Sequence, residues 1–347
     1  MSNNNNLPSD HLPSGHPAIS TGRVGVLLVN LGTPDGTDVP SIRRYLREFL
    51  SDRRVIEVPK VIWWFILNLF IVTFRSPKTA KAYAKIWRTE SDESPLRYYT
   101  RQQSEALAAR FADDSAVIVD WAMRYGQPSI PERLTALKDA GAERILVFPL
   151  YPQYSATTTA TVVDRVADTL RAMRWQPTIR FVPPYHDDPA YIDALAASVH
   201  AAGLEEGGDT VLLASFHGLP QAYFEKGDPY HCHCHKTARL LRERLGMSPD
   251  RLRLSFQSRF GPKAWLQPYT DVTLQELATA GHTDVAVLTP GFAADCVETL
   301  EEIAIEGRAT FEAAGGREFR MLPCLNDSDD HVDMLEAITR RELSGWL

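Results

Sequence analysis

Short apolar runs recur along the chain from residue 24 onward and alternate with segments of helical period. The runs are rich in Val, Leu, Ile and Phe and occupy residues 24–31, 116–123, 144–151, 178–185, 210–216, 252–258, 284–291 and 319–325. Runs of this kind, without polar alternation, are typical of parallel strands that are buried on both faces. Between them, segments such as PERLTALKDAG and KTARLLRERLG have the spacing of amphipathic helices. The alternation predicts an α/β fold built on mostly parallel sheets.

The later part of the chain repeats features of the earlier part. LLVNLGTP at residues 27–34 is similar to LASFHGLP at residues 213–220, and PLYPQYSATTT follows one late strand as PGFAADCVETL follows another. Ligands of open α/β sheets bind beyond the carboxyl ends of the strands, and two related halves would place those ends across a common cleft. We therefore expect two similar domains, each a parallel sheet flanked by helices, with the active-site cleft between them.

The expected division of the chain follows from where these patterns begin and end. Residues 1–21 are rich in Asn, Pro, Ser and His and have no Lys or Arg, so we expect a disordered polar tail and not a targeting peptide. Residues 22–185 then form an N-terminal domain, and residues 186–319 form a C-terminal domain. Residues 320–347 contain a closing helix, DHVDMLEAITRREL, that we expect to pack back on the N-terminal domain.

The charge and the cysteine content exclude several classes of protein. The 347 residues include 37 Lys and Arg against 44 Asp and Glu, a net charge of −7, so the chain lacks the basic excess of a nucleic-acid-binding protein. Four Cys in a chain of this length do not form a disulfide scaffold and fit a reducing cytoplasm. Because no G-x-G-x-x-G, P-loop or G-x-S-x-G motif occurs, dinucleotide, nucleotide and serine-hydrolase interpretations lose their main support.

One candidate for chemistry stands at the end of a predicted strand. His217 lies in SFHGLP, where Gly218 and Pro220 end the strand. Functional groups of α/β proteins gather at such strand ends, and a neutral imidazole there can bind a metal or accept a proton near neutral pH. A structural histidine held by hydrogen bonds is the alternative that the pattern leaves open.

A second candidate is the acidic stripe of PGFAADCVETLEEIAIE. We expect a helix to begin near Asp295, which places Glu298, Glu302 and Glu306 on one face. A row of carboxylates that starts where a strand ends can guide a hard divalent cation. A solvated acidic face is the alternative interpretation.

A third cluster, His231-Cys232-His233-Cys234-His235, is dense in metal-binding atoms. Its alternation does not match the spacing of structural zinc sites. On a helix that continues into KTARLLRERL, adjacent side chains point in different directions and cannot all reach one ion. We interpret the segment as a weak or accidental surface site that catalysis does not need, and the sequence leaves open whether it binds a metal.

Taken together, these segments resemble the ferrochelatase family, and among its members they look most like the proteobacterial ones. The motifs that carry the resemblance occur in the family's order from about residue 22 to the C-terminal helix: VNLGTP, FRSPKTAKAY, MRYGQP, YPQYSATTT, SFHGLP, GDPY, FQSRFGPKAWLQPYTD and GFAADCVETLEEI. Ferrochelatases are lyases that insert Fe²⁺ into a porphyrin in the last step of haem biosynthesis. The resemblance implies two Rossmann-like domains that enclose a porphyrin cleft, with porphyrin and ferrous iron as substrates.

The resemblance also implies roles for particular residues. His217 and Glu298 match the catalytic pair that faces the macrocycle from opposite sides and is usually given as the iron ligands. Glu302 and Glu306 match the acidic path that continues inward from Glu298. The residues that match porphyrin-binding positions are Leu31, Arg75, Tyr83, Ser94, Arg124, Tyr125 and Trp265.

Two positions depart from the pattern of other members. Cys296 stands two residues before Glu298, where some members have an aromatic residue or a histidine. Animal-type enzymes hold a 2Fe–2S cluster with one Cys in the YPQYS segment and three in a C-terminal extension. Here Ala156 occupies the first position and the sequence ends at Leu347, so we expect no such cluster and no cofactor besides the substrate Fe²⁺.

Two other functions compete with iron insertion. One is the insertion of another metal into a tetrapyrrole, and the other is the binding of haem without catalysis. A cobalt or nickel chelatase of corrinoid-type tetrapyrroles usually has a second His where this chain has Glu298. A non-catalytic haem carrier would need no acidic stripe. We expect protoporphyrin IX as the substrate and a monomeric enzyme, while coproporphyrin, the face from which iron arrives and the oligomeric state stay open.

One apolar block, from Trp63 to Phe74, is too short to span a bilayer and is interrupted by Asn68 and Thr73. Its apolar residues cover every face of a helical period, which is more than one buried helix face needs. A core helix is the alternative. We expect a cytoplasmic enzyme in which this block forms one lip of the cleft, in weak peripheral contact with the inner face of a membrane.

Overall fold

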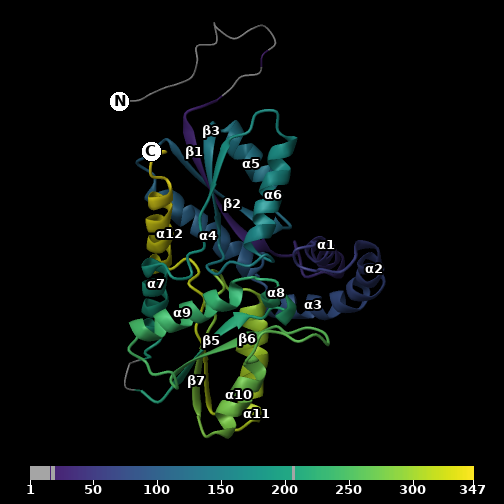
Figure 1. Cartoon of the computed structure of the whole chain (residues 1–347), viewed down its shortest axis with the longest axis vertical. Coiled ribbons are helices and arrows are strands. Elements are labelled where there is room, and N and C mark those ends of the chain that lie inside the picture. Colours follow the sequence, from purple (N-terminus) through teal and green to yellow (C-terminus); the bar gives the residue numbers. More distant parts are fainter. Residues whose placement is uncertain (1–15, 17–19, 205–207) are drawn as a thin grey trace.

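Two four-stranded parallel sheets form the framework of the computed structural model, which describes residues 16, 20–204 and 208–347. Most of the expected polar tail, residues 1–15 and 17–19, lies outside the described residues. Figure 1 shows the two sheets one above the other, each flanked by helices. The strands are β1 (Arg23–Gly32), β2 (Val117–Tyr125), β3 (Ala142–Pro149), β4 (Thr178–Phe181), β5 (Val211–His217), β6 (Leu252–Gln257), β7 (Asp284–Leu288) and β8 (Glu318–Met321). Every run that the sequence predicted as a strand is one.

The two sheets have the same strand order. The first is ordered β2-β1-β3-β4 and the second β6-β5-β7-β8, and every neighbouring pair is parallel. β1 and β5 therefore occupy equivalent interior places. The segments that follow them, which are similar in sequence, leave their sheets at corresponding points. The prediction of an α/β fold with two similar halves is confirmed.

Five strands end earlier than their apolar runs, and three of them end at least three residues earlier. β4, β7 and β8 each stop two positions before a proline, at Pro183, Pro290 and Pro323. Proline has no N–H to donate to a neighbouring strand, so regular pairing ends ahead of it. One further backbone bond follows β4 and β8, from Val182 to Val147 and from Leu322 to Val287, and the chain then leads into the loops at the edge of the sheet.

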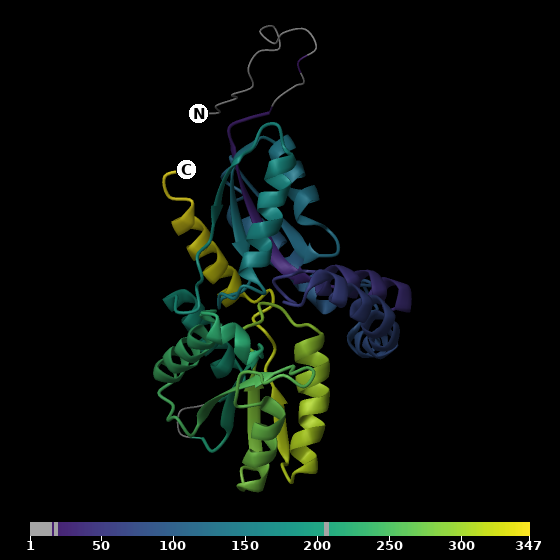
Figure 2. The ribbon, with the colours of Figure 1, turned by 45° about the vertical axis from the view of Figure 1, so that its right-hand side comes forward.

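The helices connect the strands and cover the sheets. Those of the first half are α1 (Val39–Leu50), α2 (Lys60–Phe65), the π-helix η2 (Ile66–Ile71), α3 (Val72–Ile86), α4 (Pro95–Arg110), α5 (Ile130–Asp139) and α6 (Thr159–Ala172). Those of the second half are α7 (Pro189–Ala201), α8 (Gln221–Glu225), α9 (Tyr230–Arg244), α10 (Thr270–Thr279), the π-helix η3 (Glu298–Gly307), α11 (Arg308–Ala313) and α12 (Asp329–Glu342). In both views α1, α2 and α3 project to the side as an arm, opposite α12 (Figures 1 and 2).

One buried apolar cluster is continuous between the two halves. The closing helix α12 packs against both α4 and α7. Leu335 of α12 lies in the same cluster as Leu107 of α4 and Val199 of α7. Because this cluster crosses the expected boundary between residues 185 and 186, the division into domains stays a prediction.

The arm exposes the apolar block that the sequence pattern singles out. Trp63 packs inward, and its indole nitrogen donates to the carbonyl oxygen of Leu50 at 2.6 Å. Seven other side chains of the arm are 52–72% exposed: Val61, Ile62, Trp64, Phe65, Leu69, Phe70 and Phe74. The core-helix alternative is therefore wrong for these exposed residues, whereas Leu67 and Val72 of the same block are buried. Within the described part of the chain, no helix combines the length and the hydrophobicity that crossing a bilayer requires.

We predict that Gly32→Ala strongly destabilises the fold. Gly32 ends β1 with a φ of +112°, and a Cβ there would lie 1.8 Å from the carbonyl oxygen of Tyr125 in the neighbouring strand. Since the backbone of a paired strand cannot move aside, we expect the free energy of unfolding to fall by more than about 4 kcal/mol. Urea unfolding measures this loss.

Gly203→Ala is the matched control for that substitution. Its φ is also positive, at +71°, but a Cβ there would meet nothing within 4 Å. Only the strain of the left-handed backbone remains, so we expect a loss of about 1–2 kcal/mol. Equal losses in the two variants would contradict the steric account of Gly32.

Candidate active site

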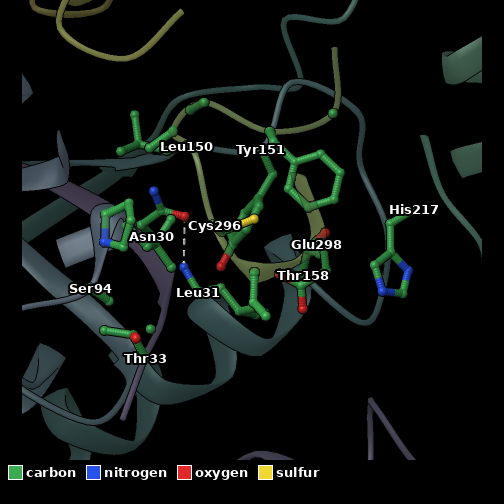
Figure 3. A pocket seen from close by; sticks show the side chains of 18 of the residues that line it. Asn30, Leu31, Thr33, Ser94, Leu150, Tyr151, Thr158, His217, Cys296 and Glu298 are labelled. Carbon is green, nitrogen blue, oxygen red and sulfur yellow. Dashed lines mark hydrogen bonds between the residues drawn. The ribbon is translucent and has the colours of Figure 1, made fainter. Parts of the chain in front are cut away.

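A cleft opens between the two sheets, at the carboxyl ends of their interior strands. Its empty volume is about 790 Å³, including the part that is open to solvent. The end of β1 contributes Asn30, Leu31 and Thr33, and the end of β5 contributes His217 (Figure 3). The segment after β7 contributes residues 291–294 and 296–298, of which Glu298 is the first residue of η3. Strand ends from both halves thus share one cleft, as expected for sheets of this kind.

His217 is the last residue of β5, and its ring is fixed by the backbone. Its Nδ1 lies 2.7 Å from the carbonyl oxygen of Gly218. Because a carbonyl oxygen only accepts, Nδ1 carries the proton, and Nε2 keeps its lone pair for a ligand or a proton. Glycine is required at position 218, since a Cβ there would lie 2.7 Å from the carbonyl oxygen of Gln257. The strand end therefore presents one basic ring nitrogen to the cleft.

Glu298 begins the π-helix η3, where the sequence analysis expected an α-helix. The side-chain amide of Gln257, at the end of β6, donates to the backbone carbonyl of Glu298 at 2.8 Å and fixes this first turn. A π-helix is rare and is frequently found at functional sites. Cys296 also lines the cleft, and burial raises the pKa of its thiol well above the usual value. The lining at this point therefore combines a carboxyl with a protonated thiol.

A buried polar network fixes the segment just before η3. Asp295 accepts hydrogen bonds from the side chains of Thr299, at 2.9 Å, and Asn326, at 2.8 Å. The side-chain oxygen of Asn326 in turn accepts from the backbone N–H of Asp295 at 2.9 Å. Because all three residues are buried, these bonds tie the turn that carries Glu298 to the segment that leads into α12.

The predicted acidic stripe is divided between two cavities. Glu298 lies in the cleft, whereas Glu302 and Glu306 line a second cavity. Glu302 accepts from the backbone N–H and the hydroxyl of Ser258 at 2.6 and 2.5 Å. Burial raises the pKa of Glu302 above its usual value, although the bonds from Ser258 oppose the shift. Glu302 is thus a half-buried, hydrogen-bonded carboxyl and not part of a freely solvated face.

The walls of the cleft are mostly apolar and aromatic. Leu31, Tyr83 and Ser94, which match porphyrin-binding positions, are among them. Ser94 is also the N-cap of α4, where its hydroxyl accepts the N–H of Arg97 at 3.2 Å. The lining residues that the sequence analysis missed include Asn30, Tyr45, Tyr151, Gln153, Thr158, Tyr230 and Phe292. Most of them lie in motifs that directly follow a strand. That position in the sequence could have indicated that they line the cleft.

Arg75 and Trp265 do not line the cleft but meet at the loop after β6. The guanidinium of Arg75, on α3, lies 4.3 Å from the ring centre of Phe260. The indole nitrogen of Trp265 donates to the carbonyl oxygen of Phe260 at 2.9 Å. Arg75 therefore connects the arm to this loop, and Trp265 fixes the loop itself.

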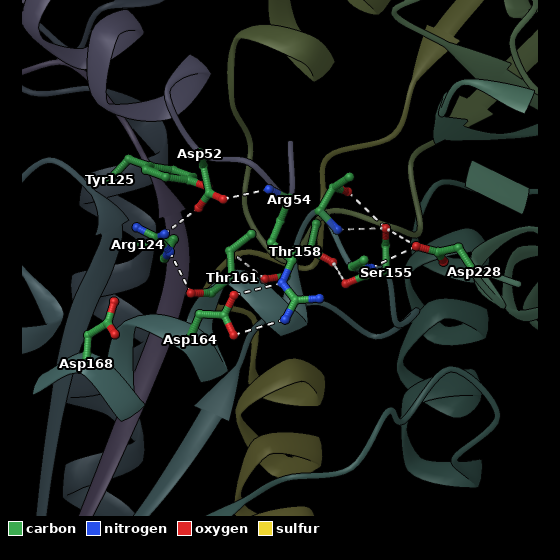
Figure 4. A network of polar contacts seen from close by, with 12 residues as sticks. Asp52, Arg54, Arg124, Tyr125, Ser155, Thr158, Thr161, Asp164, Asp168 and Asp228 are labelled. Atoms are coloured by element: carbon green, nitrogen blue, oxygen red, sulfur yellow. Dashed lines mark hydrogen bonds and ion pairs between the residues drawn. The ribbon is translucent and has the colours of Figure 1, made fainter. Parts of the chain in front are cut away.

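Arg124 and Tyr125 do not line the cleft either and belong to a polar network at the end of β2 (Figure 4). Both bind Asp52, Arg124 in an ion pair and Tyr125 through its hydroxyl at 2.9 Å. The Nε of Arg124 also donates to the carbonyl oxygen of Thr161 at 2.8 Å. The guanidinium is therefore engaged by the protein on both sides.

Two similar parallel sheets that share one cleft, with a histidine at the end of an interior strand, define the chelatase fold. SirB from Bacillus subtilis with Fe³⁺ has a TM-score of 0.58 at 12% identity, over 93% of this chain and 98% of that chain. The sirohydrochlorin chelatase SirB from Bacillus subtilis subspecies spizizenii in complex with cobalt has a TM-score of 0.53 at 11% identity, over 93% and 96%. At such identities the likeness shows the fold alone.

Sequence comparison narrows this class to one family. The sequence model of the ferrochelatase family matches residues 23–343. The ferrochelatase of Rhizobium meliloti (strain 1021) is 59% identical over 334 residues, which cover 96% of this chain and 98% of the relative. That of Agrobacterium fabrum (strain C58) is 58% identical over 338 residues, which cover 97% and 98%. The chain therefore belongs to the ferrochelatase family, whose reaction is the insertion of Fe²⁺ into protoporphyrin IX.

Proposed function

We propose that the cleft between the sheets is where this chain inserts Fe²⁺ into protoporphyrin IX, forming protohaem and releasing two protons. The observation that carries the proposal is that an imidazole at a strand end, His217, and a carboxyl, Glu298, line one mostly apolar cleft. Membership of the ferrochelatase family supports this reaction over those of a corrinoid chelatase or a haem carrier.

The reaction poses a definite physical problem. A free-base porphyrin is planar and keeps two N–H protons, and both must leave as the metal enters. Distortion of the ring exposes the lone pairs of the pyrrole nitrogens, and contacts at the ring's periphery can supply the binding energy for that strain. In our proposal Leu31, Tyr83 and Ser94 make these contacts, because they lie in the apolar wall of the cleft.

His217 and Glu298 take complementary parts in the exchange of one ion for two protons. Nε2 of His217 receives the metal or accepts a pyrrole proton, since Nδ1–H is held by Gly218. Glu298 supplies a negative charge that binds the ferrous ion or leads protons away. Glu302 and Glu306 extend this acidic path into the second cavity.

The remaining matched residues act through others in this proposal. Arg75 connects the arm to the loop after β6 through Phe260, and Trp265 fixes that loop. Arg124 and Tyr125 hold Asp52 and so shape the loops at the end of the first sheet. Among the described residues none of the four lines the empty cleft, so their contacts support a positioning role, while their match to porphyrin-binding positions stays a prediction.

We predict that His217→Ala abolishes insertion while the fold remains. The substitution removes one imidazole at a strand end and no core side chain, so kcat is expected to fall by about 10²–10⁴-fold with unchanged urea unfolding. Anaerobic insertion of Fe²⁺ into protoporphyrin IX, followed by porphyrin fluorescence, measures the loss. His200→Ala, at an exposed position of α7, is the control.

Two outcomes of this assay would contradict the proposal. A folded His217→Ala variant that keeps more than a small fraction of kcat would remove His217 from the reaction. An unmodified chain that binds haem without forming it, or that inserts Co²⁺ into sirohydrochlorin but no Fe²⁺ into protoporphyrin IX, would overturn the function itself.

Glu298→Gln keeps the shape of the side chain and removes its charge. We therefore expect it to impair metal binding more than porphyrin binding, and the turnover rate at limiting Fe²⁺ should fall at least about tenfold. Glu306→Gln, in the second cavity, makes the same chemical change and is expected to lose less. Titration of Fe²⁺ at fixed porphyrin compares the two variants, and normal turnover of Glu298→Gln at limiting iron would refute the acidic path.

We expect the purified chain to lack an iron–sulfur cluster. At the position of the first cluster ligand of animal-type enzymes, Ala156 donates its backbone N–H to Asp228 at 2.8 Å. In the described ranges, no three His, Cys, Asp or Glu side chains are grouped to hold a metal. The protein is therefore expected to show neither the visible absorption of a cluster nor acid-labile sulfide, and stoichiometric sulfide would disprove this.

We also propose that the chain acts in the cytoplasm as a monomer, with weak membrane contact through its arm. Trp64, Phe65, Leu69 and Phe70 form an exposed apolar patch on the arm. Such a patch can rest in the headgroup region of a bilayer without crossing it. Because an apolar porphyrin partitions into lipid, this contact would place the cleft next to its substrate.

Replacing Trp64 and Phe65 together by Asp is expected to reduce binding to vesicles of phosphatidylglycerol and phosphatidylethanolamine. KM for vesicle-delivered porphyrin should rise and kcat should stay nearly unchanged, because the patch lies outside the cleft lining. Trp175→Asp changes another exposed tryptophan and is the control. Unfolding of the double variant, or unchanged vesicle binding, would show that the patch has no membrane role.

A further inference from the structure

The helix α9 begins with the His231–His235 segment, which the proposed insertion reaction does not use. Its side chains point to different surroundings, as the helical spacing predicts. His233 stacks on His186 with ring centres 3.6 Å apart, and its Nδ1 accepts the backbone N–H of Tyr154 at 3.2 Å. Cys234 is completely buried in the apolar core. His233 and Cys234 are therefore engaged by the protein itself.

His231 and His235 form a separate pair on the other side of the segment. They are four residues apart, and their ring centres lie 4.3 Å from each other with an angle of 41° between the planes. The ring of His231 lies 5.2 Å from that of Phe224 and 5.8 Å from that of Phe256. His235 is exposed to solvent. Aromatic contacts thus restrict the pair on one flank, while the other flank leaves room for water.

We propose that His231 and His235 bind one divalent cation of the kind that prefers imidazole, such as Zn²⁺, Ni²⁺, Co²⁺ or Cu²⁺. Two histidines four residues apart on one helix lie on the same face, within reach of one ion. Imidazole suits these borderline cations, whereas hard cations prefer oxygen ligands. Both ligands belong to α9, and neither lines the cleft that contains His217 and Glu298.

Water completes the coordination of this site. In the part of the chain that the structure describes, no group of three or more His, Cys, Asp or Glu side chains surrounds one ion, so the protein supplies two ligands. An open two-ligand site exchanges its ion readily, unlike the closed four-ligand sites of structural zinc.

Equilibrium dialysis of the full chain against Zn²⁺ and against Ni²⁺, without porphyrin, tests the proposal. The double variant with His231→Gln and His235→Gln is expected to bind one cation fewer per chain. Each single variant should weaken that binding at least about tenfold. Insertion of Fe²⁺ into protoporphyrin IX should be unchanged, because neither residue lines the cleft. His200→Gln, which changes an exposed histidine of α7, should leave binding intact.

Ni²⁺ broadening of histidine ring resonances gives a second, independent readout. The resonances assigned to His231 and His235 should broaden at lower Ni²⁺ than that of His200. Unchanged stoichiometry in the double variant would overturn the site. So would loss of the cation in Cys232→Ser alone, since this would assign binding to the exposed thiol beside the pair. If the double variant does not fold, the two single variants and the broadening decide the matter.

Discussion

Parallel pairing on both sides of β1 and β5 is the constraint on which the site depends. Because all strands of a parallel sheet run in one direction, their carboxyl ends meet at a single edge. β1 lies between β2 and β3, and β5 lies between β6 and β7, so both edges of each interior strand are hydrogen-bonded. His217, the last residue of β5, is paired with Gln257 of β6, and the carbonyl of the next residue sets its tautomer. Two sheets of the same order then bring two such edges to one cleft.

Glu298 has a different kind of support. It lies at the start of a π-helix, and the residues around it are fixed by buried polar groups that satisfy one another, with Asp295 at their centre. In an apolar interior each unpaired member of such a network is destabilising by about 1–3 kcal/mol, so the bonds are kept or lost together. The imidazole and the carboxyl of the cleft are thus positioned by independent parts of the fold.

The strands, the repeat and the position of His217 and Glu298 beside strand ends could be predicted because they leave local traces in the sequence. The π geometry of η3 could not, since a row of glutamates fits the face of an α-helix or a π-helix. The engagement of Arg124 was equally hidden, because its partner Asp52 lies 72 residues away in the sequence. The exposure of Trp64 agrees with the expected lip, but the inward packing of its neighbour Trp63 depends on the contact with Leu50, which composition does not encode. The pairing of His231 with His235 needed ring positions and not only spacing.

The cluster shared by α4, α7 and α12 has a mechanical consequence. Swinging the two sheets apart would expose side chains such as Leu107, Val199 and Leu335, each of which contributes about 1.5–3 kcal/mol by its burial. The two halves are therefore held together by this cluster on the side of α12. The arm of α1, α2 and α3 lies on the opposite side (Figures 1 and 2). We therefore expect a flat macrocycle to enter and leave the cleft on the side of the arm, because opening on the side of α12 would expose this shared core.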